Sequence, residues 1–184
     1  MPEPVEILDA CSLLSLYASQ HLEPVLRSRK PQCCIVDRVY KESLYIRKHI
    51  EETSELDYEP VSLNPFLESG LIKLLFLETE EEKNLFIELA ANLDDGESAT
   101  IALAIERQMN IVTEDRKAIR IFNERKSANV CTTTLDLIKE WQKKEGIDRK
   151  TIQTVLKNIV EFGSYKPGRN HHLFDWWNEM IRIK

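Results

Sequence analysis

Short apolar segments alternate with longer amphipathic segments along this chain. Residues 5–8 form an apolar run that ends at Asp9, and a helical pattern follows it. Further apolar runs at residues 33–36, 111–112 and 130–132 are each followed by another helical pattern. Short strands that alternate with helices of about ten or more residues indicate βαβ units and a parallel sheet. The pattern therefore predicts an α/β protein.

The middle of the chain has a less regular pattern. Residues 70–77 are either a strand or a connecting apolar segment. Residues 81–92 predict an amphipathic helix, and residues 97–108 predict a buried one. Two strongly acidic stretches, residues 51–60 and 78–82, are expected to be solvated. The first is expected to be a loop or helix end, and the second the first turn of the next helix.

A further helix is predicted from residue 37 to residue 50. Val39, Ile46 and Ile50 fall on one face of that helix, and Glu42 falls on the same face. A glutamate on an apolar face needs a partner, because burying an unpaired charge is costly. Glu42 is therefore either a candidate site residue or a surface acid that pairs with a neighbouring lysine or arginine.

The pattern changes near the end of the chain. Residues 147–163 predict a helix with Asp148 at its N-terminal cap, and residues 169–184 predict an aromatic-rich last helix. We expect one domain over residues 1–146, with a helical extension over residues 147–184 that packs on the same domain.

Composition narrows the possible functions. The chain has 184 residues, 42% of them hydrophobic, which is enough for one domain with a proper core. A net charge of −6 argues against broad electrostatic binding of nucleic acid, although local basic patches matter more than the total. The four cysteines form no CxxC pair and indicate buried thiols of a cytoplasmic protein. We expect no membrane span and no signal peptide, because the apolar runs are short and the N-terminus lacks a basic segment.

Three carboxylates are expected at one edge of the predicted sheet. Asp9 ends the first strand, Asp115 follows another strand, and Glu97 begins a helix. Ligands bind outside the carboxyl ends of the strands in open parallel sheets. Each acid also has an ordinary explanation, because Asp9 and Asp115 can cap or begin a helix and Glu97 can form a capping box with Asp94. Their expected common location, rather than any one of them, indicates a site.

Carboxylates held close together repel one another, and a hard divalent cation relieves that repulsion. Mg²⁺ and Mn²⁺ take oxygen ligands and use only a few carboxylates, with water and substrate phosphate in the remaining positions. A site of this kind supports metal-assisted hydrolysis of phosphodiester bonds. The chain contains no glycine-rich phosphate loop and no serine, cysteine or zinc-protease motif that would indicate another chemistry.

The order and spacing of several segments resemble the PIN-domain family, which includes the ribonuclease toxins of prokaryotic toxin–antitoxin pairs. The segments are "ILDACSLLSL" with Asp9, "GESATIALA" with Glu97 and "NIVTEDRKA" with Asp115. Glu42 in "IVDRVYKESL" matches an acid that many members carry in the helix after the second strand.

The resemblance covers roughly residues 5 to 135. It implies a Rossmann-like α/β/α sandwich, Mg²⁺ or Mn²⁺ at the acidic cleft, and endonuclease activity on single-stranded or structured RNA. Toxin members are neutralised by a small antitoxin protein, and many members are homodimers. Cys11 and Ser12 lie where the family has small polar residues, and Glu114 is a second acid in the last motif. Ser12 and Glu114 are candidate accessory residues.

The resulting interpretation is a metal-dependent endoribonuclease, and the toxin of such a pair is its more specific form. Asp9, Glu97 and Asp115 would be its metal ligands, and Glu42 would complete the set of catalytic acids. Thr113 is expected to orient Asp115 or the substrate through its hydroxyl. The basic residues of the following helix are expected either to contact the RNA backbone or to form an ordinary solvated face; they are Arg116, Lys117 and Arg120.

Two other functions compete with this interpretation. A catalytically silent PIN-like module that binds protein or RNA would fit the net acidity and the long acidic segment, although it would not need converging carboxylates. A metal-dependent phosphatase would need a second aspartate after the first strand, and "DAC" lacks one. Cleavage of labelled RNA separates the nuclease from both.

Overall fold

A computed structural model of the chain describes residues 5–42, 44–49, 56–125 and 129–182. The chain folds into two compact units, and segments distant in sequence contribute to each. The first unit comprises Met1–Leu13, Arg29–Glu42 and Ser62–Thr133, and the second comprises Leu14–Ser28, Ser43–Val61 and Thr134–Lys184.

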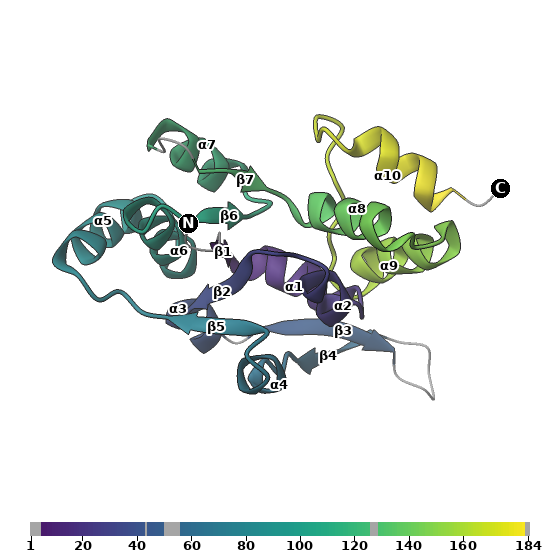
Figure 1. The fold of residues 1–184 in the computed structure, drawn as a ribbon, viewed down its shortest axis with the longest axis horizontal. Coiled ribbons are helices and arrows are strands. Elements are labelled where there is room, and N and C mark those ends of the chain that lie inside the picture. Colours follow the sequence, from purple (N-terminus) through teal and green to yellow (C-terminus); the bar gives the residue numbers. More distant parts are fainter. Residues whose placement is uncertain (1–4, 43, 50–55, 126–128, 183–184) are drawn as a thin grey trace. The chain divides into compact units, whose positions relative to one another are not determined.

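A five-stranded parallel sheet forms the centre of the first unit (Figure 1). Its strands lie in the order β5-β2-β1-β6-β7, and each neighbouring pair is parallel. The predicted parallel sheet is therefore confirmed, and the ambiguous segment at residues 70–77 contains a strand. The strands are β1 (Val5–Leu8), β2 (Gln32–Val36), β5 (Ile72–Leu75), β6 (Asn110–Val112) and β7 (Cys131–Thr132).

The pairing of β1 with β6 positions the predicted site. Leu8 pairs with Val112, so both strands end at the same edge of the sheet. Ile7, Leu8 and Val112 are fully buried, which explains why these short apolar runs form central strands. The residues that follow, Asp9 and Thr113, are therefore carried to the same edge.

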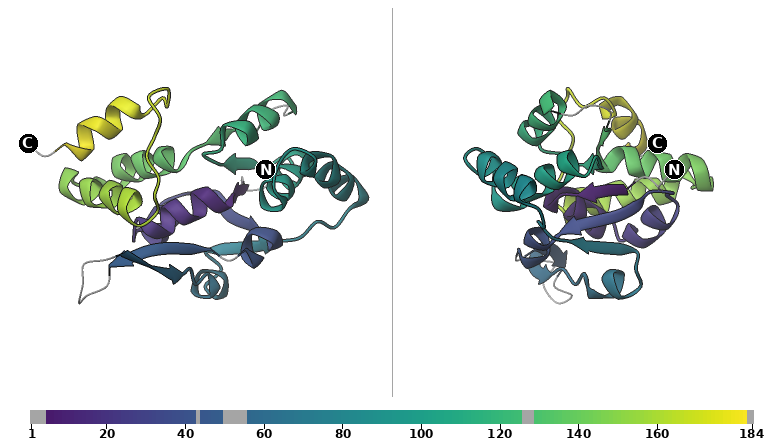
Figure 2. Two further views of the ribbon diagram at one scale, coloured as in Figure 1. Left: turned by 180° about the vertical axis from the view of Figure 1, so that it is seen from behind. Right: turned by 60° about the vertical axis from the view of Figure 1, so that its left-hand side comes forward.

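Helices flank this sheet. Helices α5 and α6 pack side by side, as both views of Figure 2 show, and α6 also contacts β1, β2 and β6. The small apolar residues of α6 are buried, which confirms the prediction of a buried helix here. The helices of the first unit are α3 (Asp37–Lys41), α4 (Asn64–Glu68), α5 (Glu80–Ala90), α6 (Asp95–Glu106) and α7 (Arg116–Arg125). Helix α1 (Ala10–Ala18) begins in the first unit and continues into the second.

The second unit is mainly helical. Asp148 caps its helix α9 by accepting a hydrogen bond from the backbone N–H of Thr151 at 3.0 Å, which confirms the predicted cap. Its elements are α2 (Leu22–Arg27), β3 (Tyr45–His49), β4 (Leu56–Pro60), α8 (Thr134–Glu145), α9 (Arg149–Glu161) and α10 (Phe174–Ile181).

Within the described ranges, no helix is long and apolar enough to cross a bilayer.

The predicted helix over residues 37–50 was wrong. Helix α3 ends at Lys41, and the chain then forms β3, which pairs with β4 in an antiparallel hairpin. Val39 and Ile46 are both buried, but they belong to different elements, and Ile50 lies outside the described residues. The apolar residues have the spacing of one helix, although they lie in a helix and in the strand that follows it. Periodicity alone does not distinguish these two arrangements.

The two acidic stretches also differ from the prediction. Residues 56–60 of the first form β4, and residues 51–55 lie outside the described residues. The second stretch begins α5 as predicted, but its Glu82 is only 2% exposed. A run of acidic residues can therefore contain one buried, paired member.

Candidate active site

Asp9 is buried at the carboxyl end of β1, with an exposed fraction of 3%. Its Oδ1 accepts a hydrogen bond from the backbone N–H of Ser12 at 2.8 Å, as an N-terminal helix cap does. The thiol of Cys11 donates to both carboxylate oxygens, at 3.2 Å and 3.1 Å. The capping role that the sequence left open is thus present, but Asp9 has other partners as well.

Thr113 connects Asp9 to Asp115. Its hydroxyl is fully buried, donates to Oδ2 of Asp9 and accepts from the backbone N–H of Asp115 at 3.1 Å. Asp115 in turn accepts from the backbone N–H of Ala118 at 2.7 Å, so it caps the start of α7. One threonine therefore fixes the relative position of two of the predicted acids, and Thr113 holds them through its hydroxyl.

Glu97 lies in the first turn of α6 without serving as its cap. Asp94 performs that role, because its Oδ1 accepts from the backbone N–H of Glu97 at 2.8 Å. Among the described residues, the reverse bond from the Asp94 N–H to the Glu97 carboxylate does not form, so the capping box is incomplete. The Glu97 side chain is therefore not committed to the backbone of its own helix.

Glu42 follows the last residue of α3 and approaches the start of α6. Its Oε1 lies so close to Gly96 that a methyl group built there would be 2.0 Å away. The prediction that Glu42 lies on the inward face of a continuous helix was wrong, but the side chain still reaches the segment that carries Glu97.

The pKa values of these acids show that they interact through space. The pKa of Glu97 rises to about 7. Burial is the main cause, and the charges of Asp94, Asp115 and Asp9 add to it. Burial also raises the pKa of Glu42 to about 6, again with contributions from Asp94 and Asp9. Acids from separate segments of the first unit therefore repel one another. Asp9, Glu42, Glu97 and Asp115 are called the acidic group below.

Asp9 itself is subject to opposing influences. Burial raises its pKa, and this is the strongest effect. Hydrogen bonds from Thr113, Ser12 and Cys11 act in the opposite direction by stabilising the carboxylate. The Ser12 hydroxyl is buried and makes no well-formed hydrogen bond to a described residue, although it is close enough to affect Asp9.

The chemistry of the acidic group suits a hard divalent cation, since all four side chains offer carboxylate oxygens and neighbouring negative charges raise the pKa of Glu42 and Glu97. Its geometry is less complete. In the part of the chain that the structure describes, no group of three or more histidine, cysteine, aspartate or glutamate side chains is close enough to hold a metal ion. The capping bonds of Asp9 and Asp115 help to explain this, because each carboxylate is also turned toward its own helix.

The other predicted residues belong to the segment that follows Thr113. Glu114 is half-buried, and both its backbone and its charge affect the pKa of the Cys11 thiol, which burial raises most strongly. Arg116, Lys117 and Arg120 are exposed on α7, whose buried side is formed by Ala118 and Phe122. Lys117 donates to the backbone oxygen of Asn92, and Arg116 and Arg120 share one face of the helix.

Sequence reasoning gave no role in the site to two contributors. The Cys11 thiol touches Asp9 directly, and Asp94 affects the pKa of both glutamates of the acidic group. The sequence placed Cys11 only at a small polar position of the family, although a side chain two residues after Asp9 can fold back on its carboxylate. Asp94 was recognised only as a cap.

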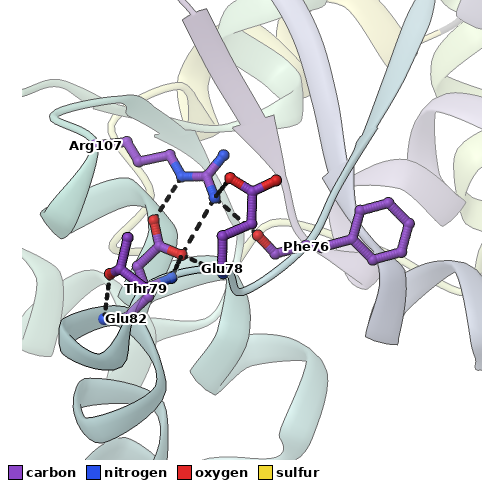
Figure 3. Close-up of polar contacts among 5 residues, drawn as sticks. All are labelled: Phe76, Glu78, Thr79, Glu82 and Arg107. Carbon is purple, nitrogen blue, oxygen red and sulfur yellow. Dashed lines mark hydrogen bonds and ion pairs between the residues drawn. The ribbon is translucent and has the colours of Figure 1, made fainter.

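A second set of acids in the same unit has a full set of partners (Figure 3). Arg107 donates from Nε to Oε1 of Glu82 at 2.7 Å, and from Nη2 to the backbone oxygen of Phe76 at 2.8 Å. Glu82 also accepts from the backbone N–H groups of Glu78 at 2.6 Å and Thr79 at 3.2 Å. The Arg107 hydrogen bond is the main reason why the pKa of Glu82 falls to about 2.

Comparison with known proteins identifies the family. A family model described as a PIN domain matches residues 5–169. Neither the curated proteins nor the solved structures contain a match to the chain. PIN domains are generally nucleases and typically use divalent metals, which agrees with the chemistry of the acidic group. The match covers most of the chain and confirms the resemblance in its motifs, so the chain belongs to the PIN-domain family.

Proposed function

We propose that this protein is a metal-dependent endoribonuclease that hydrolyses RNA phosphodiester bonds at the acidic group. The main support is the raised pKa of Glu97, to about 7, which reflects burial and the charges of Asp94, Asp115 and Asp9. A scaffold gains nothing from crowding carboxylates in this way, because each raised pKa destabilises the ionised fold at neutral pH. A cation would compensate that cost.

Asp9, Glu97 and Asp115 would hold Mg²⁺ or Mn²⁺, with Glu42 as an additional acid. When bound, the ion lowers the pKa of an attacking water and stabilises negative charge on the departing oxygen. Thr113 orients Asp9 by donating to it and fixes the backbone of Asp115. The chain's own contribution would be to bring these acids, which come from separate segments, close enough to share a cation.

The basic face of α7 would contact the substrate. Arg116 follows directly after Asp115, and Arg120 lies about one helical turn further on; both are exposed, so they would contact phosphates of an RNA bound at the acidic group. Lys117 would add to this face from its position beside Asn92. These contacts provide affinity without sequence preference, because phosphates are the same at every position.

The family resemblance extends the proposal to partners. A small antitoxin protein that covers the acidic group, a homodimer and a cytoplasmic location belong to the same proposal. Purification with a co-expressed neighbouring gene product and light scattering would test the first two.

Cleavage of labelled RNA in the presence of Mn²⁺ tests the proposal directly. We expect the wild-type protein to cleave, and Asp9→Asn and Asp115→Asn to lose cleavage while they remain folded. EDTA should abolish the activity, and added Mn²⁺ should restore it. Binding of RNA without cleavage under any divalent metal, with no change in thermal stability on adding Mn²⁺, would instead support the silent binding module.

A further inference from the structure

Gly96 occupies a position where a larger side chain would displace Glu42. A methyl group at Gly96 would lie 2.0 Å from Oε1 of Glu42, 3.2 Å from its Cδ and 3.3 Å from Cγ2 of Val39. The first of these separations is far below any van der Waals contact. The carboxyl end of Glu42 therefore fills the space that a side chain at residue 96 would take.

The backbone does not require glycine here. Gly96 is the second residue of α6 and does not have a positive φ, in contrast to Gly70 and Gly146. Glycine is in general less favourable in a helix than alanine, because it loses more conformational freedom on folding. What distinguishes glycine at this position is therefore that it leaves room for the Glu42 carboxyl group.

Glu42 follows the last residue of α3 and has an extended backbone conformation, with φ −63° and ψ 141°. Its carboxylate lies near the N-terminal end of α6, where Gly96 is the second helical residue. The missing side chain at Gly96 leaves room for the carboxylate there, although burial and the charges of Asp94, Asp9 and Asp95 disfavour its ionised form.

We propose that Gly96 is a positioning residue, which places the carboxylate of Glu42 within the acidic group by leaving room for it against the first turn of α6. Its effect on catalysis rests on the proposed nuclease function, whereas the placement of Glu42 does not. The two residues of the "GE" pair then have separate roles, because Gly96 makes room for the carboxylate of Glu42 and Glu97 supplies a carboxylate of its own.

The substitution Gly96→Ala tests the placement in protein without metal or RNA. The clash involves the far end of a flexible side chain, so we expect the variant to fold, with a melting temperature within about 2 °C of wild type. Glu42 should move away from its neighbours. Carbon-13 NMR should then show its carboxyl pKa falling from about 6 toward the ordinary 4.5. The pKa would fall mainly because the Glu42 carboxyl becomes less buried, and then because Asp94, Asp9 and Asp95 lose influence on it.

Ser98→Ala is the matched control. Ser98 lies two residues further along the same helix, is fully buried and makes no hydrogen bond to a described residue through its hydroxyl. We expect the pKa of Glu42 in this variant to stay at its wild-type value. A Glu42 pKa that is also unchanged in Gly96→Ala would overturn the proposal.

Activity separates positioning from a general structural effect. Gly96→Ala and Glu42→Gln should each lower the rate of RNA cleavage about 10- to 100-fold, and the double variant should be no slower than Glu42→Gln alone. Losses that multiply in the double variant would mean that Gly96 acts independently of Glu42 and would also overturn the proposal. A wild-type protein that cleaves no RNA would contradict the nuclease function. The titration of Glu42 in Gly96→Ala would still decide whether Gly96 positions the Glu42 carboxylate.

Discussion

Glu82 and Glu97 occupy the same position in two neighbouring helices, yet their pKa values shift in opposite directions. Each is the third residue of its helix, after the caps Thr79 and Asp94. The pKa of Glu82 falls to about 2, whereas that of Glu97 rises to about 7. The local sequence is therefore not what separates a stabilising glutamate from a candidate functional one.

The difference lies in the partners that each carboxylate finds. Glu82 completes a capping box with Thr79 and pairs with Arg107, so its negative charge is fully compensated. Glu97 does not fold back onto its cap and has Asp94, Asp115 and Asp9 as its charged neighbours. The first arrangement is complete within the chain, whereas the second leaves the Glu97 carboxylate among other negative charges.

The largest expected difference between the two glutamates is in catalysis. We expect Glu97→Gln to reduce the rate of RNA cleavage with Mn²⁺ by at least about 100-fold, as for groups that act directly in a reaction. Glu82→Gln should keep the wild-type rate at temperatures where it is folded. Initial rates on labelled RNA measure both, and equal losses in the two variants would contradict the distinction.

Stability should show the opposite order. Arg107→Ala leaves the buried Glu82 carboxylate without its main partner, and we expect it to lower the free energy of unfolding by about 2–3 kcal/mol. Glu97→Gln should leave the stability unchanged or raise it, because it removes repulsion. Urea unfolding measures these effects. Arg125→Ala, which breaks the exposed pair with Glu88, is the control and should have little effect.

In the metal-free protein, the pH dependence of stability should reflect both the lowered pKa of Glu82 and the raised pKa of Glu97. Below the ordinary glutamate pKa of 4.5, Glu82 binds fewer protons in the folded than in the unfolded state, so stability should rise from about pH 2 to pH 4.5. Glu97 binds more protons when folded, so stability should fall from pH 4.5 to about pH 7. Thermal melts across this range should show the acid limb disappear in Glu82→Gln and the neutral limb weaken in Glu97→Gln. A flat profile in the wild type would count against both assignments.

The smallest effect is expected on the basic face of α7. Arg120→Ala should weaken RNA binding only a few-fold and reduce the steepness of its salt dependence by about one phosphate contact. Arg125→Ala is a matched control, because Arg125 is already paired with Glu88. Binding measured at several salt concentrations with Asp9→Asn protein, which should not cleave, would show whether Arg120 contacts the RNA.

Much of the fold follows from the sequence because the central strands are fully buried. The runs that end at Leu8 and Val112 are short and apolar, and their parallel pairing brings Asp9 and Thr113 to one edge. The cap of α9 by Asp148 was also predictable, since it depends only on residues three apart.

The failures arise where contacts distant in sequence decide the outcome. The segment after Lys41 turns into a hairpin because β4 is available to pair with it, which helical spacing does not reveal. Glu82 and Arg107 are separated by 25 residues, so their ion pair appears only once α5 and α6 are packed. The contact of Glu42 with Gly96 depends on tertiary structure in the same way.

The most direct test is a titration of the Glu97 carboxyl group by carbon-13 NMR, with and without Mg²⁺. Its signal can be assigned by comparison with the spectrum of Glu97→Gln. We predict a pKa of about 7 in the metal-free protein and a lower apparent pKa when Mg²⁺ is added, because the cation favours the ionised carboxylate. A pKa near the ordinary 4.5 that does not respond to Mg²⁺ would contradict the proposal that the acidic group binds a cation.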